Sequence, residues 1–324
     1  MAACAEAPVQ GGNNNATKPH ASGRESARAM STAVVAPPVT QLTSLMPAVI
    51  AALSFSGTDI LLKVAYASGM DVLTLASLRG LLVVACFWTW LRIAPPVRRH
   101  TGRERAIALG LGVLFAMTMF GLLKAISLLP VSIAILAYFI YPLLTGIGGS
   151  LTGVERLGTR GLLTAGAAFL GLALMLGRSF GDLSVLGLGF AFGAALCRVI
   201  SLLATRAFLG GTDARMTTWY SMVPSTILFV AAYLAFGAWN VPQNLGGWGA
   251  FVGVAVTSTL STLLIYMSTN TVGPFRTALV MNLEPLVTLI ASMALLEEVL
   301  SPVQMLGASV MLAALCAFQF ARGR

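Results

Sequence analysis

The chain has 324 residues, of which 57% are hydrophobic and 10% are charged, and its mean hydropathy is +0.86. These values exclude an ordinary soluble domain, in which about 25% of residues are charged, and they predict a polytopic membrane protein. A net charge of +9 would, in a soluble protein, suggest nucleic acid as a binding partner. However, the basic residues lie in short loops and tails rather than on an aromatic-studded face, so we expect no nucleic-acid partner.

Residues 1–42 are rich in Ala, Ser, Asn, Gly and Pro, and we expect them to form a disordered cytoplasmic tail. Three bases in this tail precede the short, mildly apolar stretch AMSTAVVA, which runs into Pro37 and Pro38. That pattern argues against a cleaved signal peptide. A targeting role as a transit peptide is the alternative interpretation, because Ser, Ala and Arg are frequent.

Ten apolar segments follow, each close to the ~20 residues that a helix needs to cross a bilayer. The predicted spans are 43–66, 71–92, 105–127, 129–152, 159–178, 183–205, 214–237, 247–269, 274–296 and 302–320. Gly177 and Gly181 are turn signals that place a boundary between two halves. We therefore predict an all-α membrane protein with two repeats, 43–178 and 179–321.

The distribution of Lys and Arg predicts the orientation. With the N-terminus inside, fifteen of the twenty basic residues fall in cytoplasmic loops and tails, and only Arg178 falls in an outside loop. Both termini are then cytoplasmic, at an inner (plasma) membrane. Because five spans per half is an odd number, the second repeat runs through the membrane in the opposite direction to the first, as in many secondary transporters.

A costly pair of residues lies in the ninth span, where Glu284 directly precedes Pro285. A carboxylate at the centre of a membrane helix costs about 2.5 to 3.5 kcal/mol, and the proline removes a backbone hydrogen bond. Such a residue needs a bundle interior or a water-filled cavity. Glu284 is therefore the first candidate site residue, with either a cargo contact or proton coupling as its role. The alternative is a purely structural charge held by a buried base such as Arg198.

The ninth span has an equivalent in the first half. A shift of 143 residues places Pro285 on Pro142, and Tyr141 then stands where Glu284 stands. Tyr138 lies three residues earlier on the same helical face and joins Tyr141 as a candidate pore-lining residue, although packing is an equally good interpretation. The motif GFAFG at 189–193 predicts close helix packing through its two glycines.

Three further charged residues lie within apolar spans. Asp59 precedes Lys63 by four residues, so the two share a helix face and either form a local ion pair or contribute to a site. Arg79 lies deep in the second span, and Arg198 lies in the sixth. We include Asp59, Arg79 and Arg198 among the candidate site residues.

These features resemble the drug/metabolite transporter superfamily, and specifically its EamA-type members, which have ten helices in two repeats. The resemblance covers about 43–320. It rests on Pro142 and Pro285, on the Glu155 and Glu298 that follow them, on a base at Arg79, and on the closing stretch LLEEVLSPVQMLGASVMLAAL. The resemblance implies a cavity between the repeats, alternating access by rocking, and most commonly export of small metabolites. The long tail departs from the family pattern, and Glu284 occurs in some members only.

Catalysis is not predicted. The two histidines, His20 and His100, lie in the tail and a loop, and the chain has no metal-binding or nucleophile-elbow motif. We expect no cofactor and no metal. Acid and base within the spans suit a small polar cargo such as an amino acid or a derivative, with export as the favoured direction and protons as a candidate coupling ion. Uptake of a vitamin-like heterocycle, stacked on the tyrosines, is the alternative.

Overall fold

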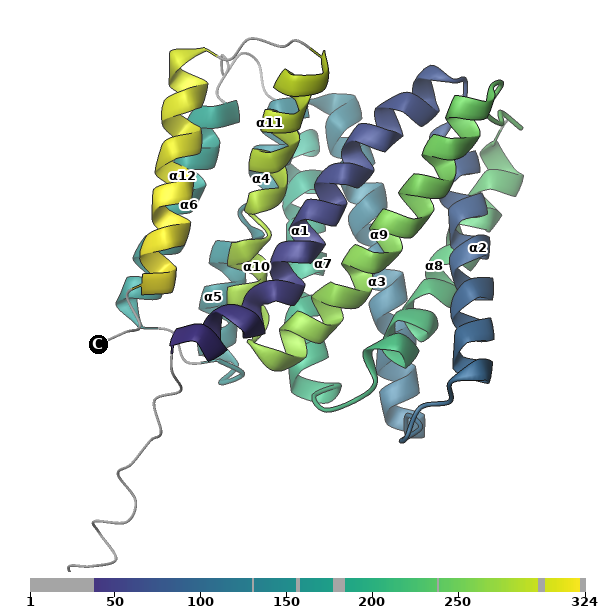
Figure 1. The fold of residues 1–324 in the computed structure, drawn as a ribbon, viewed down its shortest axis with the longest axis horizontal. Helices are drawn as coiled ribbons and strands as arrows, with labels where there is room; N and C mark the ends of the chain where they lie inside the picture. Colours follow the sequence, from purple (N-terminus) through teal and green to yellow (C-terminus); the bar gives the residue numbers. More distant parts are fainter. Residues whose placement is uncertain are drawn as a thin grey trace, which may run out of the picture.

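The computed structural model of the chain describes residues 38–129, 131–155, 158–176, 184–237, 239–296 and 301–320. Within these ranges the chain is helical and forms no strand (Figure 1). The helices of the first half are α1 (Pro38–Ala67), α2 (Val72–Ile93), α3 (Gly102–Leu128), α4 (Val131–Tyr138), α5 (Tyr141–Leu151) and α6 (Thr159–Leu176). Those of the second half are α7 (Val185–Phe208), α8 (Ala214–Phe236), α9 (Leu245–Thr271), α10 (Pro274–Val280), α11 (Leu283–Leu296) and α12 (Pro302–Phe320).

The predicted membrane class is confirmed by the length and composition of these helices. In the described part of the chain, seven helical stretches are long and apolar enough to cross a bilayer, and shorter apolar helices lie in α6 and α12. Several helices begin at a polar residue whose side chain caps the first turn. For example, Asp71 accepts from the Thr74 N–H at 2.8 Å, and Asn244 accepts from the Gly247 N–H at 2.7 Å. Such caps satisfy backbone donors that have no partner within the helix.

Two of the predicted spans are each divided into two helices. The span predicted over 129–152 forms α4 and α5, and the span predicted over 274–296 forms α10 and α11. Each of these predicted spans is thus interrupted near its middle. In both cases the second helix begins within two residues of the proline, Pro142 or Pro285, because proline has no N–H to donate and its ring obstructs the preceding turn.

The two halves pack as images of each other. A shift of 143 residues carries the bounds of α3 onto those of α9, and carries the first residues of α4 and α6 onto those of α10 and α12. The contacts between helices follow the same equivalence. Helix α1 packs on α9, and its equivalent α7 packs on α3. Likewise, α11 packs on α1, and its equivalent α5 packs on α7. The pairs α2–α8 and α6–α12 each join equivalent helices (Figure 1). An internal repeat produces this reciprocity.

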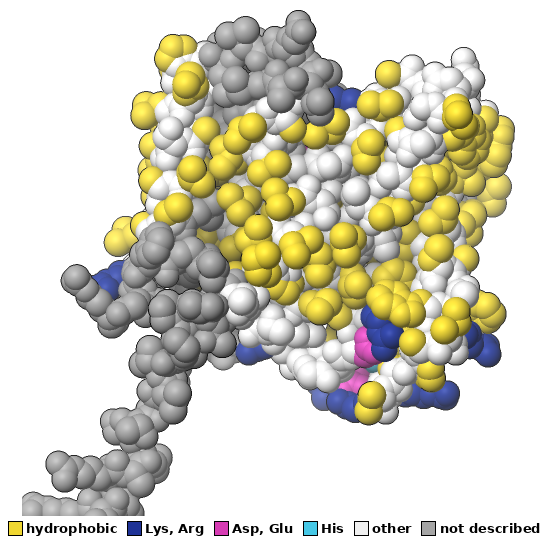
Figure 2. All heavy atoms as spheres, in the orientation of Figure 1, with side chains coloured by type: hydrophobic (Ala, Val, Ile, Leu, Met, Phe, Trp, Pro, Cys, Tyr) yellow, Lys and Arg dark blue, Asp and Glu magenta, His cyan; other side chains and the backbone are white. Residues whose placement is uncertain are grey.

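The outer surface and the interior of the bundle differ in the way a membrane requires. Large apolar side chains are exposed along α1, α2, α3, α7, α8, α9 and α12, and Figure 2 shows them over the middle of one face, with Lys and Arg gathered along the lower edge. The start of α1 and the end of α12 both lie toward that basic edge (Figure 1). The largest buried cluster surrounds the two helix breaks and includes Tyr141, Phe275, Leu279 and Met281.

Two expectations are corrected. Helix α1 begins at Pro38, so residues 38–42 are not part of a disordered tail; residues 1–37 lie outside the described residues, as do Arg178 and Glu298. Gly189 and Gly193 have open space where a side chain would project, and close packing was therefore the wrong interpretation. Gly187, two residues before Gly189 on α7, instead lies against Leu128 and Leu129 at the end of α3.

Candidate functional site

The two helix breaks meet in the core of the bundle and lie in one buried cluster. A break leaves backbone groups without helical partners, and in a membrane they must be satisfied by protein. Ser56 on α1 contacts the second break, because its hydroxyl donates to the backbone carbonyl of Glu284, the second residue of α11, at 2.8 Å. The second break is thereby attached to α1, a helix of the other half of the chain.

Glu284 lies in the first turn of α11, where the positive end of the helix dipole faces the carboxylate. Protein atoms surround the side chain, and part of its surface is still accessible. Asp59 and Arg198 are the charged groups within electrostatic range of it. Among the described residues the ion pairs are Arg98–Glu104 and Arg215–Asp213. Glu284 and Arg198 are therefore neighbours without a direct ion pair.

Asp59 comes from α1 and is attached to α11. Its carboxylate accepts a hydrogen bond from the Thr288 hydroxyl at 3.0 Å. Lys63, the expected local partner, is exposed, and the two charges form no direct ion pair in the described structure. Of the two alternatives left open by the sequence, a local ion pair with Lys63 or a contribution to a site, the structure shows no direct ion pair and a contact between helices instead. Asp59 and Glu284 form an acidic group between α1 and α11, to which Thr288 contributes a hydroxyl.

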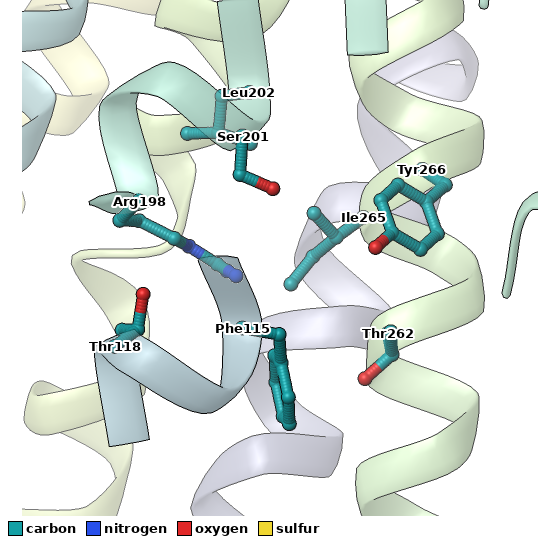
Figure 3. A pocket seen from close by; sticks show the side chains of 8 residues that line it. All are labelled: Phe115, Thr118, Arg198, Ser201, Leu202, Thr262, Ile265 and Tyr266. Atoms are coloured by element: carbon teal, nitrogen blue, oxygen red, sulfur yellow. The ribbon is translucent and has the colours of Figure 1, made fainter. Parts of the chain in front are cut away.

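Arg198 extends from α7 toward the space between α3 and α9 (Figure 3). Its guanidinium carbon lies 5.8 Å from the centroid of the Tyr141 ring, within the range of a cation–π contact. Its Nε is buried and has no hydrogen-bond partner. A cavity of about 10 Å³ adjoins it and is lined by Phe115, Thr118, Ser201, Leu202, Thr262, Ile265 and Tyr266. This volume holds about one water molecule.

Tyr138 and Tyr141 flank the first break and pack on each other, with ring centroids 5.3 Å apart. Phe139 completes the cluster, at 5.5 Å from Tyr138 and 5.7 Å from Tyr141. Tyr141 is only 2% exposed, whereas Tyr138 is half-buried. Both are within electrostatic range of Arg198 and Glu284. In this conformation Tyr138 is thus the more accessible of the two tyrosines.

Arg79 is set apart from the other five predicted site residues. It lines a second cavity of about 10 Å³, between α2, α8 and α9. The structure therefore brings Glu284, Asp59, Arg198, Tyr138 and Tyr141 into one cluster and leaves Arg79 in a neighbouring one. Thr262 lines both cavities.

Sequence reasoning missed the hydroxyl side chains of the site. Ser56 and Thr288 give no signal of their own, since isolated hydroxyls are frequent in membrane helices. The run Thr257–Thr262, TSTLST, was a usable signal, because five hydroxyls in six residues are unusual in an apolar span. Tyr266, one turn after Thr262 on α9, also lines the first cavity.

The side chains of this cluster have the chemistry to bind a charged small molecule. An acidic group, a guanidinium and several hydroxyls can hold a small polar molecule that carries charges of both signs. No group of three or more His, Cys, Asp or Glu side chains suited to a metal ion occurs in the residues that the structure describes.

Comparison with known proteins places the second half of the chain in a family. Residues 185–318 match the model of the EamA-like transporter family. The second half of the chain is an EamA-like transporter domain. The chain thus contains an EamA-like transporter domain, as the resemblance implied, and its described helices are those of a multi-pass membrane protein.

Curated relatives and a solved structure extend the comparison beyond the second half of the chain. The threonine/homoserine exporter RhtA of Escherichia coli K12 is 27% identical over 253 residues, which cover 76% of this chain and 80% of the relative. RhtA proteins of the strains CFT073 and O157:H7 match equally well. One solved structure, described only as "Crystal structure of protein", has a TM-score of 0.74 at 15% identity and covers 86% of this chain and 99% of its own. That likeness concerns the fold.

Proposed function

We propose that this EamA-type protein is a secondary transporter that exports a small amino acid or a close derivative across the inner membrane by alternating access. The observation that carries the proposal is the placement of Glu284 and Arg198, which are neighbours in the bundle interior without forming an ion pair. Two opposite charges held apart at the meeting point of two broken helices suit a zwitterion. The similarity to a threonine/homoserine exporter supports the same cargo class.

The cargo ammonium group is assigned to the acidic side of the cluster. Asp59 and Glu284 lie within electrostatic range of each other, so their ionised carboxylates repel unless a cation lies near them. A cargo ammonium ion relieves that repulsion, and so does a proton. Exchange of one for the other would couple cargo movement to a proton gradient.

The cargo carboxylate is assigned to Arg198. A guanidinium can donate two parallel hydrogen bonds to a carboxylate, and the buried Nε of Arg198 has no partner. Ser201 and Thr262 line the same cavity and offer hydroxyls to a polar cargo side chain. The alternative cargo, a vitamin-like heterocycle, requires free aromatic faces. Tyr141 is 2% exposed and packs on Tyr138 and Phe139, which favours the amino acid.

The transport cycle follows from the size of the cavity and the repeated packing. A cavity of about 10 Å³ is too small for an amino acid, so cargo loading requires the bundle to open. We assign the opening to rocking of two inverted repeats, 43–178 and 179–321, against each other. The axis of this rocking is the symmetry axis that exchanges α2 with α8. The basic edge in Figure 2 would be the cytoplasmic side, with both termini there.

Glu284→Gln tests the proposal. The amide keeps the size and hydrogen-bonding capacity of the carboxyl group but not its charge, so we expect normal membrane abundance and loss of amino acid efflux. Efflux of labelled L-threonine and L-homoserine from proteoliposomes would be measured at several pH values, together with the amount of folded protein. Glu104→Gln, at an exposed salt bridge outside the site, is the matched control.

The outcomes separate three roles for Glu284. If Glu284 only neutralises Arg198, the variant should lose abundance and thermal stability, because a buried base would remain without a counter-charge. Wild-type efflux at every pH would reject a role in binding or coupling. A comparison of metabolites inside and outside cells that lack or overproduce the protein would identify the cargo and the direction independently.

A further inference from the structure

Arg79 is a half-buried cation whose buried Nε has no acidic neighbour in the described structure. Its Nε has no hydrogen-bond partner, and no described ion pair includes it. The titratable group within electrostatic range of it is the Tyr66 hydroxyl rather than a carboxylate. Arg198, by contrast, has Glu284 nearby. An unpaired guanidinium inside a membrane bundle is costly unless an anion neutralises it.

The walls of the Arg79 cavity are rich in hydroxyls. They include Ser225 and Thr226 from α8, and Ser258, Thr259 and Thr262 from α9. The three hydroxyls of α9 donate their protons to carbonyls one turn earlier in their own helix. Their oxygens therefore present lone pairs to the cavity, whereas Arg79 presents donors. This combination suits a molecule with a carboxylate at one end and an ammonium or hydroxyl group at the other.

The Arg79 cavity lies nearer one face of the membrane than the Arg198 cavity does. Helices α2 and α7 both begin on the face opposite the start of α1 (Figure 1). Arg79 is seven residues past Val72, about 10 Å along its helix, and Arg198 is thirteen residues past Val185, about 20 Å along its helix. Thr262 lines both cavities and joins them.

From this arrangement we infer that the Arg79 cavity is a second carboxylate-binding subsite, which cargo occupies between the Glu284–Arg198 cluster and the face opposite the basic edge. Transfer of the carboxylate from Arg198 to Arg79 keeps the anion paired as the cargo moves past Thr262. The inference rests on the proposed function for the cargo itself. The carboxylate specificity of the cavity rests on the unpaired guanidinium alone.

Cysteine protection tests the subsite in the full-length protein. The four native cysteines are replaced by serine, and one reporter is introduced into each cavity: Thr259→Cys beside Arg79, or Ser201→Cys beside Arg198. Alkylation by N-ethylmaleimide in proteoliposomes is then timed with L-homoserine, with L-homoserinol, which lacks the carboxylate, or with sodium acetate. Each reporter is compared in the wild-type, Arg79→Gln and Arg79→Lys backgrounds.

We expect L-homoserine and acetate, but not L-homoserinol, to slow alkylation of the Thr259→Cys variant, by about tenfold at ten times the ligand Kd. Arg79→Gln should abolish this protection, whereas Arg79→Lys should keep part of it because the positive charge remains. Protection of the Ser201→Cys variant by L-homoserine should persist in Arg79→Gln, which also shows that the variant is folded. If Arg79→Gln does not fold, the Arg79→Lys variant and the homoserinol comparison decide.

Three results would overturn the subsite: protection by L-homoserinol equal to that by L-homoserine, protection that survives Arg79→Gln, or no protection of the Thr259→Cys variant by any carboxylate. A different result would overturn the proposed cargo instead. If acetate protects Thr259→Cys in an Arg79-dependent manner while amino acids protect neither reporter, the carboxylate site stands and amino acid transport is rejected.

Discussion

The carboxylate of Glu155 accepts a hydrogen bond from the backbone N–H of Phe275 at 3.0 Å. Glu155 follows α5 in the first half of the chain, and Phe275 is the second residue of α10 in the other half. The carboxylate thus satisfies a donor in the first turn of α10, next to the positive end of the helix. A side chain from one half thereby fixes the start of the broken span that carries Glu284.

Glu155→Gln should destabilise the protein by about 1 to 3 kcal/mol, because a hydrogen bond to a charged acceptor becomes a neutral one. The measurement is thermal unfolding of the purified protein in detergent. Gly273→Ala should give a comparable loss, since Gly273 has φ +100° and a Cβ there would lie 2.9 Å from a carboxylate oxygen of Glu155. Gly249→Ala, at an open position of α9, is the control, and an equal loss there would contradict the assignment.

Gly171→Ala should weaken the contact between α6 and α12. A Cβ at Gly171 would lie 2.6 Å from the backbone nitrogen of Met311 and 2.8 Å from the carbonyl oxygen of Gly307. Backbone atoms cannot turn away as a side chain can, so the helices must separate, at a cost of about 1 to 3 kcal/mol. Gly166→Ala on the same helix meets nothing within 4 Å and should unfold at the wild-type temperature or above it. Identical melting of the two variants would show that the close approach is not formed.

Ser56→Ala should destabilise the second helix break. The Ser56 hydroxyl lies 2.8 Å from the carbonyl of Glu284 and 3.0 Å from the carbonyl of Ala52 in its own helix, and its loss removes the bond between α1 and α11, which contributes about 0.5 to 1.5 kcal/mol. Ser309→Ala is the matched control, because its exposed hydroxyl bonds only to the carbonyl of Met305 in its own helix. Urea unfolding in detergent would compare the two variants. A larger loss in Ser309→Ala would contradict the role of Ser56.

His100 should make stability sensitive to mild acid. It is 2% exposed in the α2–α3 connection, and its Nε2 lies 3.1 Å from the Thr217 hydroxyl. Burial lowers the pKa of His100, and two neighbouring bases lower it further, whereas two acids oppose the shift; these neighbours are Arg98, Arg105, Glu104 and Asp213. Because the folded state favours neutral imidazole, its contribution is present above the unfolded pKa of about 6.5 and is lost as the pH falls.

The expected result for His100 is a lower melting temperature at pH 5.5 than at pH 7.5, with a smaller difference in His100→Gln, since glutamine does not titrate. Other groups also titrate in this range, so the comparison between wild type and variant is the measurement that matters. An undiminished pH dependence in His100→Gln would assign the effect to other groups.

The orientation of the chain is open to a direct test. A reporter fused after Arg324 should report the cytoplasm, and the same reporter inserted after Pro242, in the connection between α8 and α9, should report the outside. The positive-inside distribution of Lys and Arg is the reason. The reverse pattern at both positions would reject the assignment of the basic edge to the cytoplasm.

Hydrophobicity and proline placement already determined much of this protein at the level of sequence. Apolar spans of bilayer length established the membrane class, and the equivalence of Pro142 and Pro285 singled out the two spans that the structure shows to be interrupted. These properties are local, because the length of a span and the missing N–H of a proline do not depend on what packs against them. For the same reason Glu284 stood out before any neighbour was known.

Tertiary structure decided which residues share a site. Spacing along α1 left a pair with Lys63 and a site role open for Asp59, whereas packing of α1 on α11 gives it Thr288. Packing also separated Arg79 from Arg198, although both are bases in apolar spans. Helical periodicity reports the neighbours on one face of one helix. The register in which two helices meet depends on side chains of both, and only the folded bundle determines it.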